Sequence, residues 1–501
     1  MYFYGFLIAF LVAMSSPTLG QESKPDATKF QGSKLSKEKQ IEDFDICVTG
    51  AKEGFSGLYY YQPKPVFTHK CDSVRATLTS DASSNSFYLK LRYLLASARH
   101  GHASLNLNKK QTISFSMATL HPERHYIPMQ LICSNGKLFV VRDASKENII
   151  PQGAQIESIN GISAASLLAK MLPLMPADGN NISYKYYCLG EKYQFHFLYQ
   201  MLYPDVTHYI LKIAGQKKRI KRIGLLPQAI KETLAGKSAL PEFTDPLVYK
   251  PVVRAGVAYL KVQSFYSGFI RNFGHRTGRF LDSAFVDMAA RQTQTLLLDL
   301  RGNEGGGEAL NDTLFAHLTQ EPFTADGTAR VAGRVFTSSK YGFDLREDLQ
   351  AFINQPSAFL RDDTSLLLKP EFSETKQIKP LEPGFAGRLL VLTDGGTFSA
   401  ASIMVSYLYQ NRNTRKNPVI FIGEEAGGDI YSQVMCAGVG YNLRLPNSLF
   451  EMSVPGICTG TLNLTPPLKR LPDISIANNS KDIANGTDTV LEAALRIATR
   501  P

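Results

Sequence analysis

The chain has 501 residues and lacks the features that mark several classes of protein. After the first twenty residues, no apolar run approaches the length of a membrane-spanning helix, which excludes a polytopic membrane protein. No internal repeat or low-complexity tract is visible. Basic residues exceed acidic ones by only 55 to 44, and no winged, zinc or RNA-binding motif accompanies them, so we expect no nucleic-acid partner. A composition that is 44% hydrophobic suits a globular protein of about two to four domains.

The first twenty residues have the composition of an export signal. Residues 2–14 are nearly all apolar but too few to cross a bilayer comfortably, and small residues at 15–20 provide a cleavage site before Gln21. No Lys or Arg precedes the apolar run, so a retained N-terminal anchor is the alternative. We expect an exported protein, periplasmic, in the cell envelope or extracellular, that contacts a membrane only through this segment if it is retained.

Six cysteines are compatible with export, yet a chain of this size does not need a disulfide framework. Six cysteines can pair in about fifteen ways, so their number alone sets no connectivity. Cys436 and Cys458 flank a predicted hairpin and are the best candidates for a disulfide. The alternative is that most of the cysteines are buried free thiols.

The most informative segment is a strand that runs into a glycine-rich turn. Leu296, Leu297 and Leu298 form a short apolar run bounded by turn residues, as expected of a strand covered on both faces. Gly305 and Gly306 follow, and glycine adopts backbone conformations that let a substrate backbone come close. Their N–H groups are then available to a developing oxyanion.

About ninety residues later, a second strand and turn place a serine at the start of a helix. Residues 390–392 are apolar, an Asp-Gly-Gly turn follows, and Ser399 precedes apolar residues at helical spacing. Unpaired N–H groups and the positive end of the dipole at a helix N-terminus favour the negative charge of a tetrahedral intermediate. Ser399 is therefore the candidate nucleophile, and an ordinary N-cap serine is the alternative.

A serine nucleophile needs a base, and the chain has only nine histidines. His100 and His102 end an apolar helical pattern and flank Gly101. His121 and His125 have the i, i+4 spacing of a zinc pair, but a proline lies between them and no supporting motif is present. We therefore expect no metal site.

Four segments, taken together and in this order, resemble peptidase family S41, the serine peptidases related to C-terminal (tail-specific) processing peptidases. The likeness runs from about residue 85 to about residue 475. It implies a strand-turn signature, a nucleophile motif that is usually Thr-Ala-Ser-Ala, a following strand and turn, and the last strands of a PDZ-like domain. In this chain those segments read Asp299-Leu-Arg-Gly-Asn-Glu-Gly-Gly, Thr397-Phe-Ser-Ala, Ile422-Gly-Glu-Glu-Ala-Gly-Gly and Ile156-Glu-Ser-Ile-Asn-Gly.

The resemblance also bears on the base. Relatives of the Ser-Lys type place a lysine shortly after the turn that corresponds to residues 427–428, and this chain has none there. The other branch, which includes the tricorn-core and interphotoreceptor-retinoid-binding-like proteins, takes its base from an N-terminal Gly-His or Ser-His motif. That motif is matched by Gly101 and His102. The resemblance thus implies Ser399 with His102.

Two departures from the tricorn-like pattern leave other functions open. A serine precedes the histidine in those enzymes, where this chain has Gly101, and a late glutamate helps to orient their site. Near Pro472 and Asp473 this chain has no glutamate, so the group that orients His102 is not identified. The alternative function is a catalytically incomplete scaffold that binds a peptide or an apolar ligand, and a third is an esterase with the same dyad.

The resemblance implies an α/β (α+β) fold with a crotonase-like core, an N-terminal helical domain and a PDZ-like domain. The segment 338–380 is expected to form a lid or a helical excursion. The expected organisation is a signal peptide at 1–20, a flexible tether at 21–40, the helical domain at 41–110, the PDZ-like domain at 111–230, the catalytic core at 248–480 with its insertion at 338–380, and a C-terminal helix at 481–501.

The function implied is an exported serine endopeptidase that acts on a peptide or protein substrate. Ser399 is expected to attack the peptide carbonyl, and His102 to take its proton and return it to the leaving amine. Neither a metal nor an organic cofactor is expected. Backbone N–H groups of Gly305 or Gly306 and of Ala400 are the expected oxyanion hole, and the residues expected to shape the site are Gly302, Asn303 and Gly396.

Overall fold

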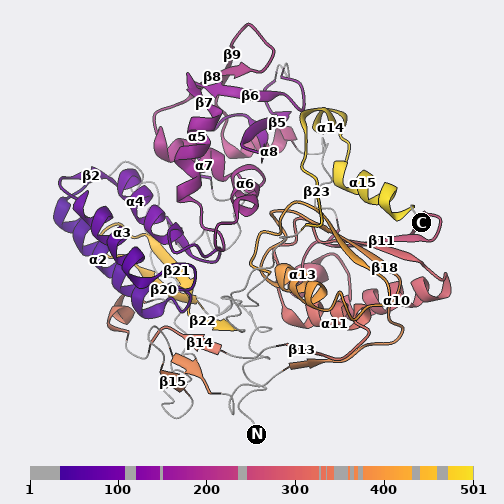
Figure 1. Ribbon diagram of the computed structural model, residues 1–501. Coiled ribbons are helices and arrows are strands. Elements are labelled where there is room, and N and C mark those ends of the chain that lie inside the picture. The colour runs from indigo at the N-terminus through magenta and orange to yellow at the C-terminus, as the bar shows by residue number, and fades with distance from the viewer. Residues whose placement is uncertain are drawn as a thin grey trace.

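A computed structural model shows two six-stranded sheets, a group of N-terminal helices and several smaller sheets (Figure 1). None of the helices described is both long and apolar enough to cross a membrane. The structure describes residues 34–107, 120–146, 150–234, 245–325, 329–333, 336–342, 359–361, 366–369, 376–430, 440–459 and 472–499.

The central sheet has six strands and is parallel except at one edge. Only β10 runs antiparallel to its neighbour. The carboxyl ends of the parallel strands therefore lie along one edge, where ligands bind in open α/β sheets. In spatial order the strands are β10 (Leu247–Arg254), β11 (Val257–Val262), β12 (Thr295–Asp299), β18 (Arg388–Thr393), β19 (Val419–Gly423) and β23 (Ile474–Ser475).

Both faces of this sheet are covered, which explains why its middle strands are apolar throughout. Leu296 and Leu298 pack against the helices of one face, and Leu297 packs against Val490 on the other. All three leucines are fully buried, as the sequence predicts. The helices concerned are α10 (Thr277–Ala290), α11 (Glu308–Leu318) and α13 (Ala400–Gln410) on the first face and α15 (Thr489–Ala498) on the second, with the short α9 (Ser267–Asn272) beside α10.

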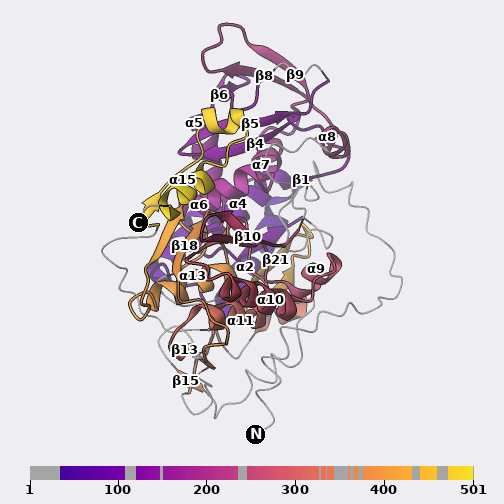
Figure 2. The ribbon, with the colours of Figure 1, turned by 90° about the vertical axis from the view of Figure 1, so that its right-hand side faces the viewer.

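A second sheet, antiparallel throughout, lies at the top of Figure 1 and remains at that end in the view turned by 90° (Figure 2). It falls within the segment 111–230, for which a PDZ-like domain remains a prediction. Its strands are β4 (Met129–Ser134), β5 (Lys137–Asp143), β6 (Gln155–Ile159), β7 (Ile162–Ser163), β8 (His208–Ile213) and β9 (Ile220–Ile223), and its helices are α5 (Ala164–Met171), η3 (Leu172–Leu174), α6 (Ile182–Gly190), α7 (Gln194–Leu202) and α8 (Pro227–Leu234).

The N-terminal helices pack on strands from the far end of the chain. Asp43 accepts hydrogen bonds from the backbone N–H groups of Asn447 and Ser448, at 3.0 and 2.7 Å. A three-stranded sheet in the order β20, β21, β3 therefore joins early and late residues. The elements are β1 (Lys34–Leu35), α2 (Lys37–Gly54), α3 (Lys64–Ala76), β2 (Ala82–Ser83), α4 (Ser84–Ala96), β3 (Ser104–Asn106), β20 (Gly440–Arg444) and β21 (Glu451–Pro455).

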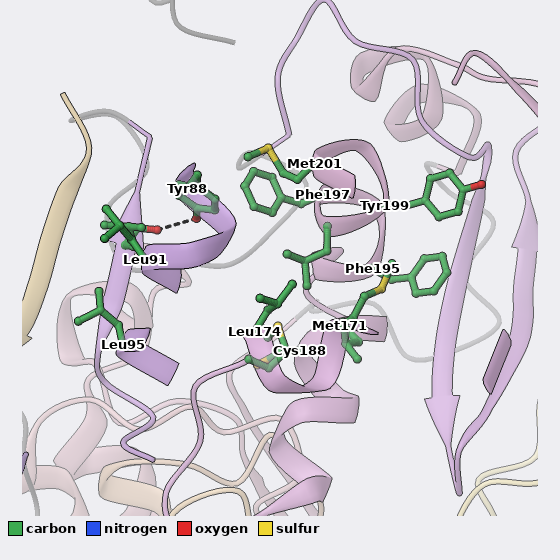
Figure 3. Packing of buried hydrophobic residues seen from close by; sticks show 14 of the residues in the cluster. Tyr88, Leu91, Leu95, Met171, Leu174, Cys188, Phe195, Phe197, Tyr199 and Met201 are labelled. Carbon is green, nitrogen blue, oxygen red and sulfur yellow. Dashed lines mark hydrogen bonds between the residues drawn. The ribbon is translucent and has the colours of Figure 1, made fainter. Parts of the chain in front are cut away.

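Helix α4 is fixed by apolar packing (Figure 3). The ring of Tyr88 meets the ring of Phe197 from α7 edge to face, with centroids 5.8 Å apart. The Tyr88 hydroxyl donates to the carbonyl of Leu105 at 2.7 Å, which ties α4 to β3. The loop between α4 and β3 is therefore held at both of its ends.

Of the segment 338–380, the structure describes residues 338–342, 359–361, 366–369 and 376–380, and the lid or helical excursion expected there stays a prediction. Its described parts are one turn of 3-10 helix and three short strands, because apolar stretches such as Leu366–Leu368 pair across an antiparallel hairpin. The elements are η4 (Thr337–Tyr341), β15 (Phe359–Arg361), β16 (Leu366–Leu368) and β17 (Lys376–Ile378), which join β13 (Phe323–Ala325), β14 (Ala329–Val331) and β22 (Ile457–Thr459) in two small sheets, and α14 (Ser480–Asn485) follows the last core strand.

Candidate active site

Ser399 lies between β18 and α13 in a backbone conformation that few residues other than glycine adopt. Its φ is +55° and its ψ is −125°. Such strain costs about 1–3 kcal/mol and persists only where the surrounding structure imposes it. An N-cap serine accepts a hydrogen bond from its helix, but the Ser399 side chain makes no such bond. Ser399 thus occupies the N-cap position of α13 but does not cap the helix through its side chain.

His102 is the partner of the Ser399 hydroxyl. It lies in the loop between α4 and β3, and its Nε2 is 3.1 Å from Ser399 Oγ, although the two residues are 297 positions apart. Burial lowers the pKa of His102 to about 4, so the ring is neutral near pH 7 and one nitrogen can accept a proton. The structure thus brings together the two residues predicted as nucleophile and base.

Aromatic rings surround this histidine. The ring centroid of Phe398 lies 4.6 Å from that of His102 and 4.3 Å from that of Tyr184, on which it stacks. A Cβ at Gly101 would come within 2.5 Å of the Phe398 ring. Phe398 therefore leaves no room for a side chain at Gly101 unless its ring moves.

The glycine-rich turn after β12 lies directly against the nucleophile. A Cβ at Gly305 would come within 2.7 Å of Ser399 Cβ and 2.8 Å of the Ala400 nitrogen, and a Cβ at Gly306 would meet the backbone of Tyr266. The φ angles of the two glycines are +95° and +136°, which L side chains rarely adopt. Space and backbone conformation both require glycine at these positions.

Two of the three predicted oxyanion donors have free N–H groups. The N–H of Gly305 donates to Oδ1 of Asn303 at 2.9 Å and is therefore occupied. Within the described ranges, the N–H groups of Gly306 and Ala400 have no acceptor. Ala400 is the first residue of α13, where helical N–H groups lack an intrahelical partner.

Asp394 joins the two turns, and its role is not evident from the sequence. Its Oδ1 accepts hydrogen bonds from the N–H groups of Gly302 and Gly396, both at 2.9 Å. Burial raises the pKa of Asp394. The carbonyl of Asn303 adds a second link, because it accepts a hydrogen bond from the Phe398 N–H at 3.0 Å. Gly302, Asn303 and Gly396 thus hold the two turns together.

Asp178 is another carboxylate at the site that sequence reasoning missed. It lies between η3 and α6, and its side chain is 11% exposed. Its Oδ1 accepts a hydrogen bond from the Gly101 N–H at 2.7 Å and lies 3.7 Å from Nδ1 of His100. His100 itself is buried. The turn that carries Asp178 has no motif, so only the folded chain reveals its place.

His100, His102 and Asp178 are also the side chains to consider as metal ligands. In the part of the chain that the structure describes, they form the one group of three whose possible ligand atoms all lie within 4.8 Å of one another. His102 Nε2 already contacts Ser399 Oγ, and Asp178 already accepts two backbone hydrogen bonds. Polar groups of the protein thus already occupy His102 and Asp178. His121 and His125 are not part of such a group.

The cysteines agree in part with expectation. Cys458 is disulfide-bonded. Its predicted partner Cys436 lies outside the described residues. Four cysteines are buried free thiols, namely Cys47, Cys71, Cys133 and Cys188.

Comparisons with known proteins support the resemblance seen in the sequence. Residues 256–446 match the model of Peptidase family S41. Mature CPAF complexed with lactacystin has 14% identity and a TM-score of 0.62, with 92% of this chain and 98% of that chain covered. Mature CPAF alone has 13% identity and a TM-score of 0.59, with 92% and 96% covered. The photosystem II D1 C-terminal processing protease has 12% identity and a TM-score of 0.40, with 92% and 97% covered.

No curated protein sequence matches the chain. At 13–14% identity the likeness to CPAF establishes the fold, which is mixed α/β as predicted. The family match covers β11, both turns and Ser399. Residues 256–446 therefore belong to peptidase family S41, a family of serine peptidases, and the chain as a whole has the fold of mature CPAF.

Proposed function

We propose that this chain is a serine endopeptidase in which Ser399 is the nucleophile and His102 the general base. The observation that carries the proposal is the 3.1 Å separation of Ser399 Oγ and His102 Nε2 at the end of a strained turn. A nucleophile within hydrogen-bonding distance of a neutral imidazole is the arrangement that activates a hydroxyl.

The reaction then follows from the positions of these groups. His102 Nε2 takes the proton as Ser399 Oγ adds to the peptide carbonyl carbon, and the carbonyl oxygen becomes an oxyanion. His102 gives that proton to the leaving amine as the C–N bond breaks. Water then attacks the acyl-enzyme by the same route, and Ser399 recovers its proton.

We assign the oxyanion hole to the N–H groups of Gly306 and Ala400. Gly305 is reassigned from donor to spacer, because its N–H is occupied by Asn303 and its missing Cβ leaves room beside Ser399. The start of α13 adds the positive end of a helix dipole. Donors fixed before the reaction stabilise developing charge without reorganisation.

We also infer that the enzyme acts outside the cytoplasm, on a peptide or protein. The apolar residues 2–14 and the small residues after them support export, and a disulfide at Cys458 suits an oxidising compartment. N-terminal sequencing of the protein recovered from the cell exterior is expected to begin near Gln21. Recovery of the full-length chain from the cytoplasm alone would contradict this.

Labelling with a fluorophosphonate tests the catalytic assignment. We expect the folded wild type to be labelled, and Ser399→Ala and His102→Ala to lose labelling. Ser406→Ala is the matched control, because Ser406 is a buried serine of the same helix that does not touch the dyad. Failure of folded wild type to react would contradict the proposal and favour a binding scaffold. Comparing peptides with esters as substrates then separates a peptidase from an esterase.

A further inference from the structure

The catalytic dyad leaves one atom of its base unexplained. If Nε2 of His102 accepts the Ser399 proton, Nδ1 must carry the hydrogen of the neutral ring. Nδ1 is sealed from solvent and has no hydrogen-bonding partner in the part of the chain that the structure describes. A base of this kind needs a group that holds the Nδ1–H tautomer and offsets the charge of the imidazolium.

Asp178 is the carboxylate placed to do this. One of its oxygens and a ring nitrogen of His102 lie within 4.8 Å of each other. The charges of the two residues act on each other, since Asp178 raises the pKa of His102 and His102 lowers the pKa of Asp178, each against a larger effect of burial. Nδ1 makes no direct hydrogen bond to Asp178, and a single bridging water molecule can join polar groups at separations up to this limit.

The carboxylate is fixed by the two loops that frame the dyad. Oδ1 accepts the N–H of Gly101, the neighbour of the base, at 2.7 Å. Oδ2 accepts the N–H of Asp429 at 3.2 Å, and the preceding Gly428 lies against Ser399 and Ser402. The N–H of Gly179 donates to the carbonyl of Arg99 at 2.9 Å and adds another tie. Asp178 is therefore hydrogen-bonded both to the loop that carries His102 and to the loop that packs against Ser399.

Other groups that face the base do not suit this role. His100 lowers the pKa of His102, and its own pKa is lowered to about 4 by burial, so it is neutral and offers no negative charge. Asp429 acts on His100 and accepts a hydrogen bond from the hydroxyl of Tyr61 at 2.8 Å. The neighbouring ring of Phe398 carries no charge.

We propose that Asp178 is the positioning residue of His102, acting through its Nδ1 and taking the place of the late glutamate that tricorn-like relatives use. The inference rests on the proposed serine peptidase function. Asp178 does not touch the reacting atoms. It selects the tautomer of the base and stabilises the imidazolium after proton transfer.

The test compares Asp178→Asn and Asp178→Glu with Asp43→Asn in the full chain. Asp43 is a matched control, because it is also a buried carboxylate held by two backbone N–H groups, but it lies on α2. We expect Asp178→Asn to slow fluorophosphonate labelling by about 100-fold. The acidic limb of the labelling rate plotted against pH should move to lower pH, because loss of the Asp178 charge lowers the pKa of His102. Asp178→Glu is expected to recover part of the rate, and Asp43→Asn to keep the wild-type pH profile.

The tautomer of His102 gives a second readout that a structural role would not change. In ¹⁵N spectra of the wild type, assigned with His102→Gln, we expect Nδ1 to carry the proton near pH 7, and Asp178→Asn to raise the Nε2–H fraction. Unchanged labelling and tautomer in folded Asp178→Asn would overturn the proposal. If the variants do not fold, a His102 ring protonated at Nε2 in the wild type overturns the proposal for Asp178. Absence of wild-type labelling by the fluorophosphonate rejects the peptidase function itself.

Discussion

Gly101 and Phe398 are expected to act as a compensating pair. The change to make is Gly101→Ser, alone and together with Phe398→Ala. The new Cβ would lie 2.5 and 2.6 Å from two ring carbons of Phe398 and 3.3 Å from Oδ1 of Asp178. The φ of Gly101 is not positive, so the backbone admits a side chain; the ring of Phe398 gives the closest contacts, and Asp178 Oδ1 is the next tight neighbour.

The magnitudes follow from burial and contact. Phe398 is 5% exposed, so Phe398→Ala is expected to cost about 3–5 kcal/mol of unfolding free energy. Gly101→Ser overpacks a ring that already contacts His102 and Tyr184, and is expected to cost about 1–3 kcal/mol. In the double variant the Phe398 ring is absent, so the overpacking cost of Gly101→Ser should largely disappear.

Urea denaturation of the four proteins measures the coupling. We expect the double variant to be about 1–3 kcal/mol more stable than the sum of the two single changes predicts. Labelling of Ser399 should be weakest in Gly101→Ser, where the displaced ring also disturbs His102. Additivity within about 0.5 kcal/mol would refute the argument that the two residues compete for one space.

Three further results are expected. The unfolding free energy of Ser399→Gly, measured by urea denaturation, should exceed that of Ser399→Ala by about 1 kcal/mol, because glycine relieves the strain at φ +55°. Equal unfolding free energies would contradict the strain. The kcat/KM of the wild type should keep its plateau down to near pH 4, because desolvation lowers the pKa of His102 to about 4 and only the protonated ring is inactive; an acidic limb near 6.5 would contradict it. Burial, and then the charge of Asp394, raise the pKa of Glu424 to about 7 from an ordinary 4.5. Between pH 4.5 and pH 7 the Glu424 carboxyl is therefore protonated in the folded state and ionised in the unfolded state. Stability should therefore fall as pH rises through that window, by at most about 3 kcal/mol, and Glu424→Gln should flatten this fall in urea titrations at pH 5 and 8.

The strands, and the position of Ser399 at the start of a helix, could be predicted because their signals are local. The apolar run Leu296–Leu298 specifies a strand covered on both faces, and the residues after Ser399 have helical spacing. His102 depended on the family resemblance, because no local pattern links residues 297 positions apart.

The groups that support the dyad could not be predicted, since their roles exist only in the fold. Asp178 occupies an unremarkable turn, and Phe398 is one residue in an otherwise familiar motif, so neither reveals what it contacts.

The pairing of β3 with β21 sets the order in which the site is completed during synthesis. Residues 104–106, directly after the base, find their strand partner only at residues 451–453. Among the described residues, this pairing can form only after most of the chain has been made, whereas the hydrogen bond from Tyr88 to Leu105 joins residues made early. A nascent chain therefore holds residues 104–106 without this strand partner until residue 451 has been made, after Ser399 itself.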